Sequence, residues 1–413
     1  LSVGIGGPSG SVASTVLTIC GTCSLSIAGS ELTNMTAATL TVGGVNSGIT
    51  VSEVTVANTA NITSFVMNAS AASSAIAFSS LGNIFANSLT ARASNGLTVS
   101  GDLTSQSGGV TLDADFDDSG AGNFVVADST TVNTTNQSLS ITGNDFNLNT
   151  SGALNAGTGA VTIIVSDSGS IGLGDTGSAM SISGAELQNI TASTLTMGDG
   201  LGGGIGVDNI TAANSNNVGT VTLNATNTGS GVSFSNTAST FNTLNVNGGS
   251  GITFNVGVTT DTGALTLDGD QDGDGTGDVN LNSSAALISN NNNISIKAND
   301  IGGSGGTINA GTGDVTITSS DNEDINVGIT TGSGMFVTGA ELQNITAANL
   351  TFSTALGIDV KGITAANSDN ISGTTTFIST GGTVTFSNTD STFNTIAANA
   401  TGNIGISVNV TTD

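Results

Sequence analysis

The stretch Gly184-Ala-Glu-Leu-Gln-Asn-Ile-Thr-Ala192 returns unchanged at 339–347 and, with three substitutions, at 29–37. Its glutamates Glu31, Glu186 and Glu341 are spaced by 155 residues (186 − 31 and 341 − 186). Other segments share this offset, so a long unit repeats rather than one motif. The sequence predicts one continuous body over residues 1–413, with copies at about 1–155, 156–310 and a shorter 311–413. The third copy stops in mid-repeat, and we expect a longer natural chain.

Within each copy, apolar and polar residues alternate. Ala264-Leu-Thr-Leu-Asp268 and Gly231-Val-Ser-Phe-Ser235 are typical, and clusters of Gly, Asn and Asp separate such segments. Alternation with period two predicts short β-strands with one buried face, and the Gly/Asn clusters predict tight turns. Helical spacing is not sustained in any segment, so we expect almost no helix.

The finer spacing predicts the coils of a solenoid. Asn-Ile-Thr-Ala occurs at Asn189 and again at Asn209, which is 20 residues further on (209 − 189). A unit of 155 residues would then hold roughly eight coils of about 19 residues each. The predicted fold class is all-β, a right-handed parallel β-helix (β-solenoid).

Two other structures fit part of this pattern. An array of β-sandwich domains also has short strands between turns, but the absence of Trp and Tyr and the single Pro argue against it. Richness in Gly, Ser, Asn and Thr is also typical of disorder. Regularly recurring Val, Ile and Leu favour an ordered chain.

Charge and composition exclude several functions. The net charge is −27, with three basic residues and no His, so the chain lacks the cations that bind nucleic-acid phosphates. No apolar run is long enough to span a bilayer, which needs about 20 residues. Because enzymes of β-helical fold pair acids with Arg, Lys or His, we expect no catalytic activity.

An acidic loop in copy two is the sharpest chemical signal. It reads Asp268-Gly-Asp270-Gln-Asp272-Gly-Asp274-Gly-Thr-Gly-Asp278, with a carboxylate at every second residue up to Asp274. Oxygen ligands at this spacing can converge on one Ca²⁺, and the glycines permit a sharp turn. The loop resembles the calcium loops of thrombospondin type 3 and dockerin repeats but lacks the bidentate Glu of an EF-hand. A solvated turn is the alternative.

Copy one has an equivalent loop, 155 residues earlier. Its predicted ligands are Asp113, Asp115, Asp117, Ser119 and Asn123. The sequence therefore predicts Ca²⁺ as a cofactor, with one site in each of these copies.

Cys20 and Cys23 are the only cysteines. No helix start or βαβ context surrounds them, as a redox motif would require. A local disulfide in a turn is the favoured interpretation, and two reduced, buried thiols are the alternative.

The sequence resembles the β-helical shafts of filamentous-haemagglutinin-type exoproteins and other giant β-strand-repeat surface proteins of bacteria. The resemblance is carried by 184–192, by Asn155-Ala-Gly-Thr-Gly-Ala-Val-Thr-Ile163 and by Gly219-Thr-Val-Thr-Leu-Asn-Ala225. It implies an extracellular or cell-surface location. The secretion domain with which such proteins begin is not recognisable.

Together these features predict the structural, calcium-stabilised shaft of an extracellular filament, sheath or fibrous surface protein. Its expected partners are copies of itself, with glycans or other cell-surface proteins as further candidates. The alternative is an adhesin stalk that presents a glycan- or receptor-binding tip outside this segment.

Overall fold

The computed structural model describes residues 15–17, 27–44, 48–79, 82–174, 177–303, 305–321, 323–329 and 333–413. The chain divides into two compact units, Leu1–Asp167 with Asn189–Thr194 and Ser168–Gln188 with Leu195–Asp413. In each unit short strands follow one another around three faces, and strand pairing within the described residues is parallel. Each unit is therefore a parallel β-helix, the fold class that the sequence predicts.

In the first unit, each complete coil adds one strand to each of three faces. The first face consists of β1 (Thr15–Leu17), β2 (Ala37–Gly44), β4 (Ile62–Ala69), β7 (Ser88–Ala93), β10 (Val110–Asp113), β13 (Leu139–Gly143) and β16 (Ala160–Val165). The second consists of β3 (Gly48–Ser52), β5 (Ala75–Ser79), β8 (Leu97–Val99), β11 (Asn123–Val126) and β14 (Asp145–Asn147). The third consists of β6 (Asn83–Phe85), β9 (Leu103–Ser105), β12 (Thr131–Asn133), β15 (Ala153–Asn155) and the start of β19 (Ile190–Met197).

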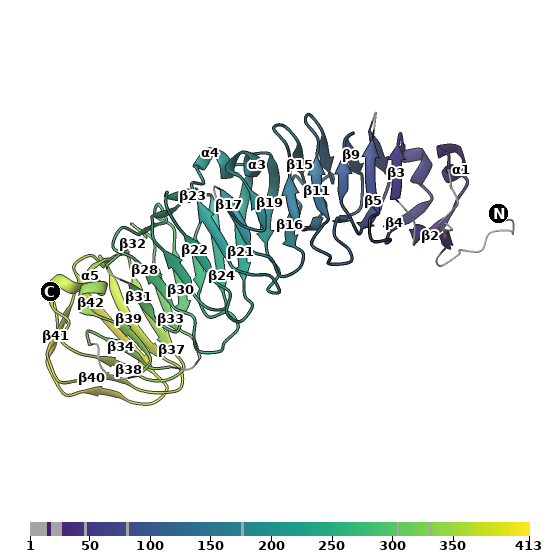
Figure 1. The fold of residues 1–413 in the computed structure, drawn as a ribbon. Helices are drawn as coiled ribbons and strands as arrows, with labels where there is room; N and C mark the ends of the chain where they lie inside the picture. The colour runs from purple at the N-terminus through teal and green to yellow at the C-terminus, as the bar shows by residue number, and fades with distance from the viewer. Residues whose placement is uncertain are drawn as a thin grey trace. The chain divides into compact units, whose positions relative to one another are not determined.

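The second unit repeats this arrangement. Its first face holds β21 (Val218–Ala225), β24 (Thr243–Gly248), β27 (Leu265–Asp268), β30 (Ile294–Ala298), β33 (Val315–Ser319), β37 (Leu350–Thr354), β39 (Thr374–Ser379) and β42 (Thr395–Ala400). Its second face begins with a seven-stranded sheet of β18 (Met180–Ile182), β17 (Ile171–Gly174), β20 (Ile205–Asp208), β22 (Val232–Phe234), β25 (Ile252–Phe254), β28 (Val279–Leu281) and β31 (Ile301–Gly303) (Figure 1).

Three shorter groups of strands complete the described part of the second unit. A five-stranded sheet contains β35 (Met335–Val337), β34 (Ile325–Val327), β38 (Ile358–Val360), β40 (Val384–Phe386) and β43 (Ile404–Ile406). The third face contains β23 (Ser239–Phe241), β26 (Val258–Thr260), β29 (Ala286–Ile288), β32 (Thr307–Asn309) and β36 (Ile345–Thr346). The last two strands, β41 (Ser391–Phe393) and β44 (Val410–Thr412), pair with each other.

The core is a set of columns of apolar side chains, one residue from each coil. Leu244, Leu265, Ile294 and Val315 stand opposite one another in register and are at most 1% exposed. Burying each such side chain contributes about 1.5–3 kcal/mol. A narrow column repeated many times explains how the chain folds with so few aromatic residues.

The coils are longer and fewer than the sequence predicts. Six register steps lead from Val221 to Thr375, a distance of 154 residues (375 − 221), so the long repeat contains six coils and not eight. Individual steps range from 21 residues (315 − 294) to 35 (350 − 315). The spacing from Asn189 to Asn209 predicts too short a coil, because the two motifs lie at different positions in the coil. The first leads into strand β19, while the second precedes a helix.

Six short helices in the described ranges also depart from the expectation of almost none. They are α1 (Gly29–Thr33), α2 (Val56–Thr59), α3 (Gly184–Gln188), α4 (Ala212–Ser215), α5 (Gly339–Gln343) and α6 (Ala365–Ser368). In α5 the Thr338 amide donates to Glu341 Oε2 at 2.7 Å, and the Glu341 amide donates to Thr338 Oγ1 at 3.2 Å. This capping box makes one helical turn stable where the apolar pattern is too short to reveal it.

Candidate metal centre

The acidic segment of copy two is a loop between β27 and β28 that closes at a narrow neck. A Cβ built on Gly277 would lie 1.9 Å from the Gly269 carbonyl oxygen, so only glycine fits there. The Gln271 amide donates to Gly248 O at 3.0 Å, and the Gly269 amide donates to Lys297 O at 2.8 Å. The loop is therefore fastened to the coil before it and to the coil after it.

Three carboxylates of this loop converge. Asp270, Asp272 and Asp274 each place one oxygen within 4.8 Å of the others. Asp270 is 0% exposed, whereas the other two side chains are exposed. The Asp274 amide donates to Asp270 Oδ1 at 3.2 Å, but no donor among the described residues reaches Asp270 Oδ2 with hydrogen-bond geometry. Within the described part of the chain, the cluster thus contains a buried carboxylate oxygen without a hydrogen-bond partner.

Asp268 and Asp278, at the two ends of the loop, are engaged elsewhere. Asp268 lies at the end of β27 and forms an ion pair with Lys297, at 3.1 Å between Nζ and Oδ2. Asp278 Oδ1 accepts a hydrogen bond from Asn299 Nδ2 at 2.9 Å. Neither belongs to the group of converging carboxylates.

Asp321, a residue that sequence reasoning missed, lies against the loop from two coils further on. A Cβ built on Gly273 or Gly275 would lie 3.5 Å or 3.3 Å from a carboxylate oxygen of Asp321. Its carboxyl is also close enough to that of Asp270 for each to influence the pKa of the other. A signal was present in the sequence, because Ser320-Asp321 repeats Ser166-Asp167 of copy one.

The electrostatics of the cluster follow from this crowding. Burial raises the pKa of Asp270, but the polar groups of Ser320, Asp321 and the loop amides outweigh burial and leave that pKa below its usual value. The pKa of Asp321 is raised, first by its contact with Asp270 and then by partial desolvation. Burial, and then the charge of Asp270, raise the pKa of Glu323. The cluster therefore concentrates more negative charge than its surroundings neutralise.

The equivalent loop of copy one is built differently. The hydroxyls of Ser119 and Ser166 donate to Asp115 at 3.2 Å and 2.6 Å, and the Gly120 amide donates at 3.0 Å. Asp115, which is 0% exposed, has hydrogen-bond donors on both of its oxygens. Where copy two has Asp274, copy one has Ser119, which is a donor.

The remaining predicted ligands of copy one do not meet. Asp113 stands opposite Arg92 in the sheet, and burial raises its pKa to about 6. The guanidinium of Arg92 also lies 5.4 Å from the centre of the Phe116 ring. Asn123 Oδ1 accepts from Asn144 Nδ2 at 3.4 Å, and Asp117 is exposed. Copy one contributes no group of three converging acidic side chains among the described residues.

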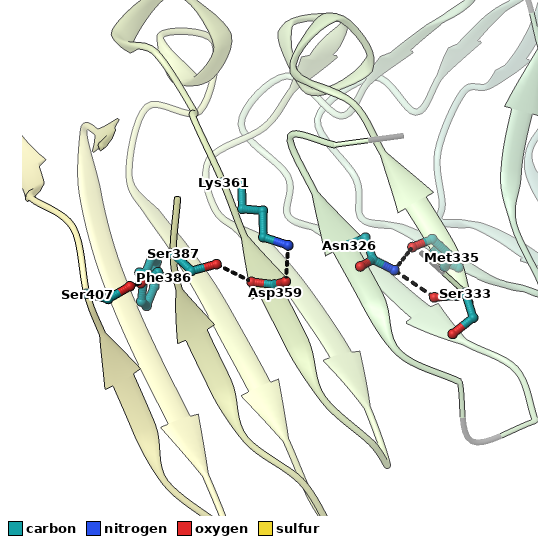
Figure 2. Close-up of polar contacts among 8 residues, drawn as sticks. All are labelled: Asn326, Ser333, Met335, Asp359, Lys361, Phe386, Ser387 and Ser407. Carbon is teal, nitrogen blue, oxygen red and sulfur yellow. Dashed lines mark hydrogen bonds and ion pairs between the residues drawn. The ribbon is translucent and has the colours of Figure 1, made fainter. Parts of the chain in front are cut away.

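The predicted cysteine pair and the basic residue Lys361 lie apart from the acidic loops in the sequence. Cys20 and Cys23 lie outside the described residues. Lys361 forms an ion pair with Asp359 Oδ2, and Ser387 Oγ donates to Asp359 Oδ1 at 3.1 Å (Figure 2). Lys361 thus forms a structural ion pair with a residue of β38.

Comparisons with known proteins and an inspection of the helices give no further assignment. Among the described residues, no helix has the length and hydropathy that crossing a bilayer requires. A search against protein-family models, curated proteins and solved structures finds no match for this chain.

Proposed function

We propose that the chain is a length of structural shaft from an extracellular filament, sheath or fibrous cell-surface protein, and that calcium stabilises it. The observation that supports this role is the in-register stacking of coils. Apolar columns such as Leu244, Leu265 and Ile294 fill the interior. The apolar side chains of each coil are therefore buried mainly against those of the adjacent coils. Each coil can therefore be followed by another of the same kind, which extends the body by about 4.8 Å per coil.

Electron microscopy of the purified chain tests the shaft. The expected particles are elongated, with a β-type circular dichroism spectrum. Val246→Asp, which places an unpaired charge at a site 0% exposed, should remove them, whereas Asn245→Asp on the outer side of the same strand should not. Compact globular particles from the unaltered chain would refute the proposal.

Localisation and calcium have their own tests. Antibodies against the chain should label intact, unpermeabilised cells of the source organism, and labelling only after permeabilisation would refute the surface location. Thermal unfolding with and without a chelator tests calcium, because an ion bound only by the folded state raises its melting temperature. An unchanged melting temperature would refute a stabilising role for calcium.

A further inference from the structure

We infer that the acidic loop of copy two holds one Ca²⁺ together with Asp321 from two coils further on, and that the equivalent loop of copy one holds none. This inference rests on the calcium part of the proposed function. It names a ligand outside the loop, restricts binding to one of two similar loops, and makes the ion a link between coils.

The size of the cluster is compatible with one calcium ion. Ca²⁺ binds oxygen ligands at about 2.3–2.6 Å, so two ligands of one ion are at most about 5 Å apart. The oxygens of Asp270, Asp272 and Asp274 satisfy this limit, since all lie within 4.8 Å of one another. The spacing of the three carboxylates is therefore compatible with their being ligands of one ion.

The buried Oδ2 of Asp270 also favours a bound cation. A buried carboxylate oxygen without a donor costs free energy, and a cation removes that cost. Asp270 Oδ2 is in this condition, and so is the neighbouring hydroxyl of Ser320. Both atoms are oxygens, the ligand type that Ca²⁺ prefers.

The position of Asp321 favours a bound cation as well. Its carboxyl lies against the loop glycines and beside Asp270. Two carboxyl groups in contact repel each other unless a proton or a cation lies between them. The nearest basic residue, Lys297, already pairs with Asp268. A divalent cation would satisfy Asp270 and Asp321 together.

The contrast with copy one makes the inference specific. There the hydroxyls of Ser119 and Ser166 and the amide of Gly120 supply donors to the buried Asp115. The Ser119 amide also donates to Asp115 Oδ1, at 3.2 Å, so each oxygen accepts two hydrogen bonds and the four lone-pair sites of the carboxylate are occupied. The two loops are thus alike in sequence but differ at the buried carboxylate. Asp115 has hydrogen-bond donors on both oxygens, whereas Oδ2 of Asp270 has none among the described residues.

Calcium binding to the full chain, measured by calorimetry after removal of bound metal, tests the site. We expect one ion per chain. Asp272→Asn and Asp321→Asn should each weaken binding by at least about tenfold, since even residues outside the ligand shell contribute 10–100-fold to metal affinity. The matched variants Asp117→Asn and Asp167→Asn, at the equivalent positions of copy one, should leave the affinity unchanged. Both pairs change exposed residues and keep the charge change equal.

A second measurement reports the link between coils. Calcium should slow hydrogen exchange of the β33 amides in the unaltered chain and in Asp167→Asn, but not in Asp321→Asn. Two ions of similar affinity, or equal effects of Asp117→Asn and Asp272→Asn, would overturn the selectivity for copy two. Binding unaffected by Asp321→Asn would overturn the role of that residue. No binding at all would overturn the metal site.

These outcomes are distinguishable from failure of the shaft. Elongated particles without calcium binding would leave the structural role intact and remove the metal site. Tight calcium binding by compact particles would do the opposite. Magnesium at equal concentration is the control for ion type, because its smaller shell demands an octahedral geometry that this loop does not impose.

Discussion

At the scale of single residues, the glycine neck decides whether the acidic loop can form. Gly277→Ala would place a Cβ 1.9 Å from a backbone oxygen. Because backbone cannot move aside as a flexible side chain can, we expect a loss of about 1–3 kcal/mol in the free energy of unfolding. Urea denaturation measures this loss. Gly177→Ala is the control, since no atom of the described residues lies within 4 Å of a Cβ there; equal effects of the two substitutions would contradict this prediction.

A second prediction at this scale concerns pH. Asp300 Oδ1 accepts hydrogen bonds from the amides of Ile301 and Phe336 at 2.9 Å and 2.8 Å, yet burial outweighs them and raises the pKa of Asp300 above its ordinary value of 3.8. A raised carboxyl pKa means that the folded state holds this proton more tightly than the unfolded state. Its contribution to stability is therefore full below about pH 3.8 and is lost as the pH rises through the folded-state pKa.

Asp300→Asn should consequently stabilise the chain near neutral pH, because an amide oxygen can still accept from both backbone amides without carrying charge. The difference from the unaltered chain should shrink toward zero as the pH falls to 3.8 and below. Urea midpoints across this range, measured with a chelator present, check the sign. A variant that is less stable than the unaltered chain at neutral pH, but equally stable in acid, would contradict this prediction and show that the charge of Asp300 stabilises the fold.

Single residues also show where sequence reasoning succeeds for the site and where it fails. Asp270, Asp272 and Asp274 are predictable because their spacing is local, and a turn brings neighbouring side chains together. Asp321 is 51 residues from Asp270 (321 − 270) and approaches only because of how the coils stack. Asp268 lies on a strand, where it faces Lys297.

At the scale of elements, three helices with one sequence pattern differ at the N-cap. The residues before α1, α3 and α5 are Ala28, Ser183 and Thr338. Thr338 and Ser183 each accept a hydrogen bond from the amide three residues later, at 3.2 Å and 3.3 Å. An alanine side chain cannot accept one.

We therefore expect Thr338→Ala to lower the free energy of unfolding by about 1 kcal/mol, and Ala28→Ser to raise it by up to about 1 kcal/mol. Urea denaturation of both variants checks the two signs. Ala185→Ser, which adds a hydroxyl within α3 but not at its N-cap, should change little. A loss of stability in Ala28→Ser would contradict the capping argument.

Elements also explain which parts of the fold could be predicted. Period-two alternation correctly indicates strands, because in β13 Leu139 and Ile141 face the core while Ser140 faces outward. Coil length could not be obtained in the same way, since the turns differ in length and only strand register shows which residues are opposite. Helices α3 and α5 could have been predicted from Ser183-x-x-Glu186 and Thr338-x-x-Glu341. This capping signature indicates a helix start without a long apolar pattern.

At the scale of the whole molecule, the charge of −27 opposes compaction. Added salt screens this repulsion, and the screening length falls from about 30 Å at 0.01 M to about 8 Å at 0.15 M ionic strength. With calcium removed, we expect the melting temperature to rise by several degrees over this range. Sodium and choline chloride should act alike, because the effect is not specific to an ion. A melting temperature that falls with salt would contradict the prediction.

The clasped acidic loop has one more consequence. In a stack of coils, stability is approximately the sum of each coil and its contacts with the adjacent ones, so unfolding can begin at any weak junction. Thr228 Oγ1, two coils before the loop, donates to Asp272 at 2.8 Å, and Asp321 approaches from two coils after it. Contacts that skip over neighbours couple these coils into a single cooperative block. Residues 228–321 should therefore unfold together, and partial unfolding that begins outside this block should stop at its ends.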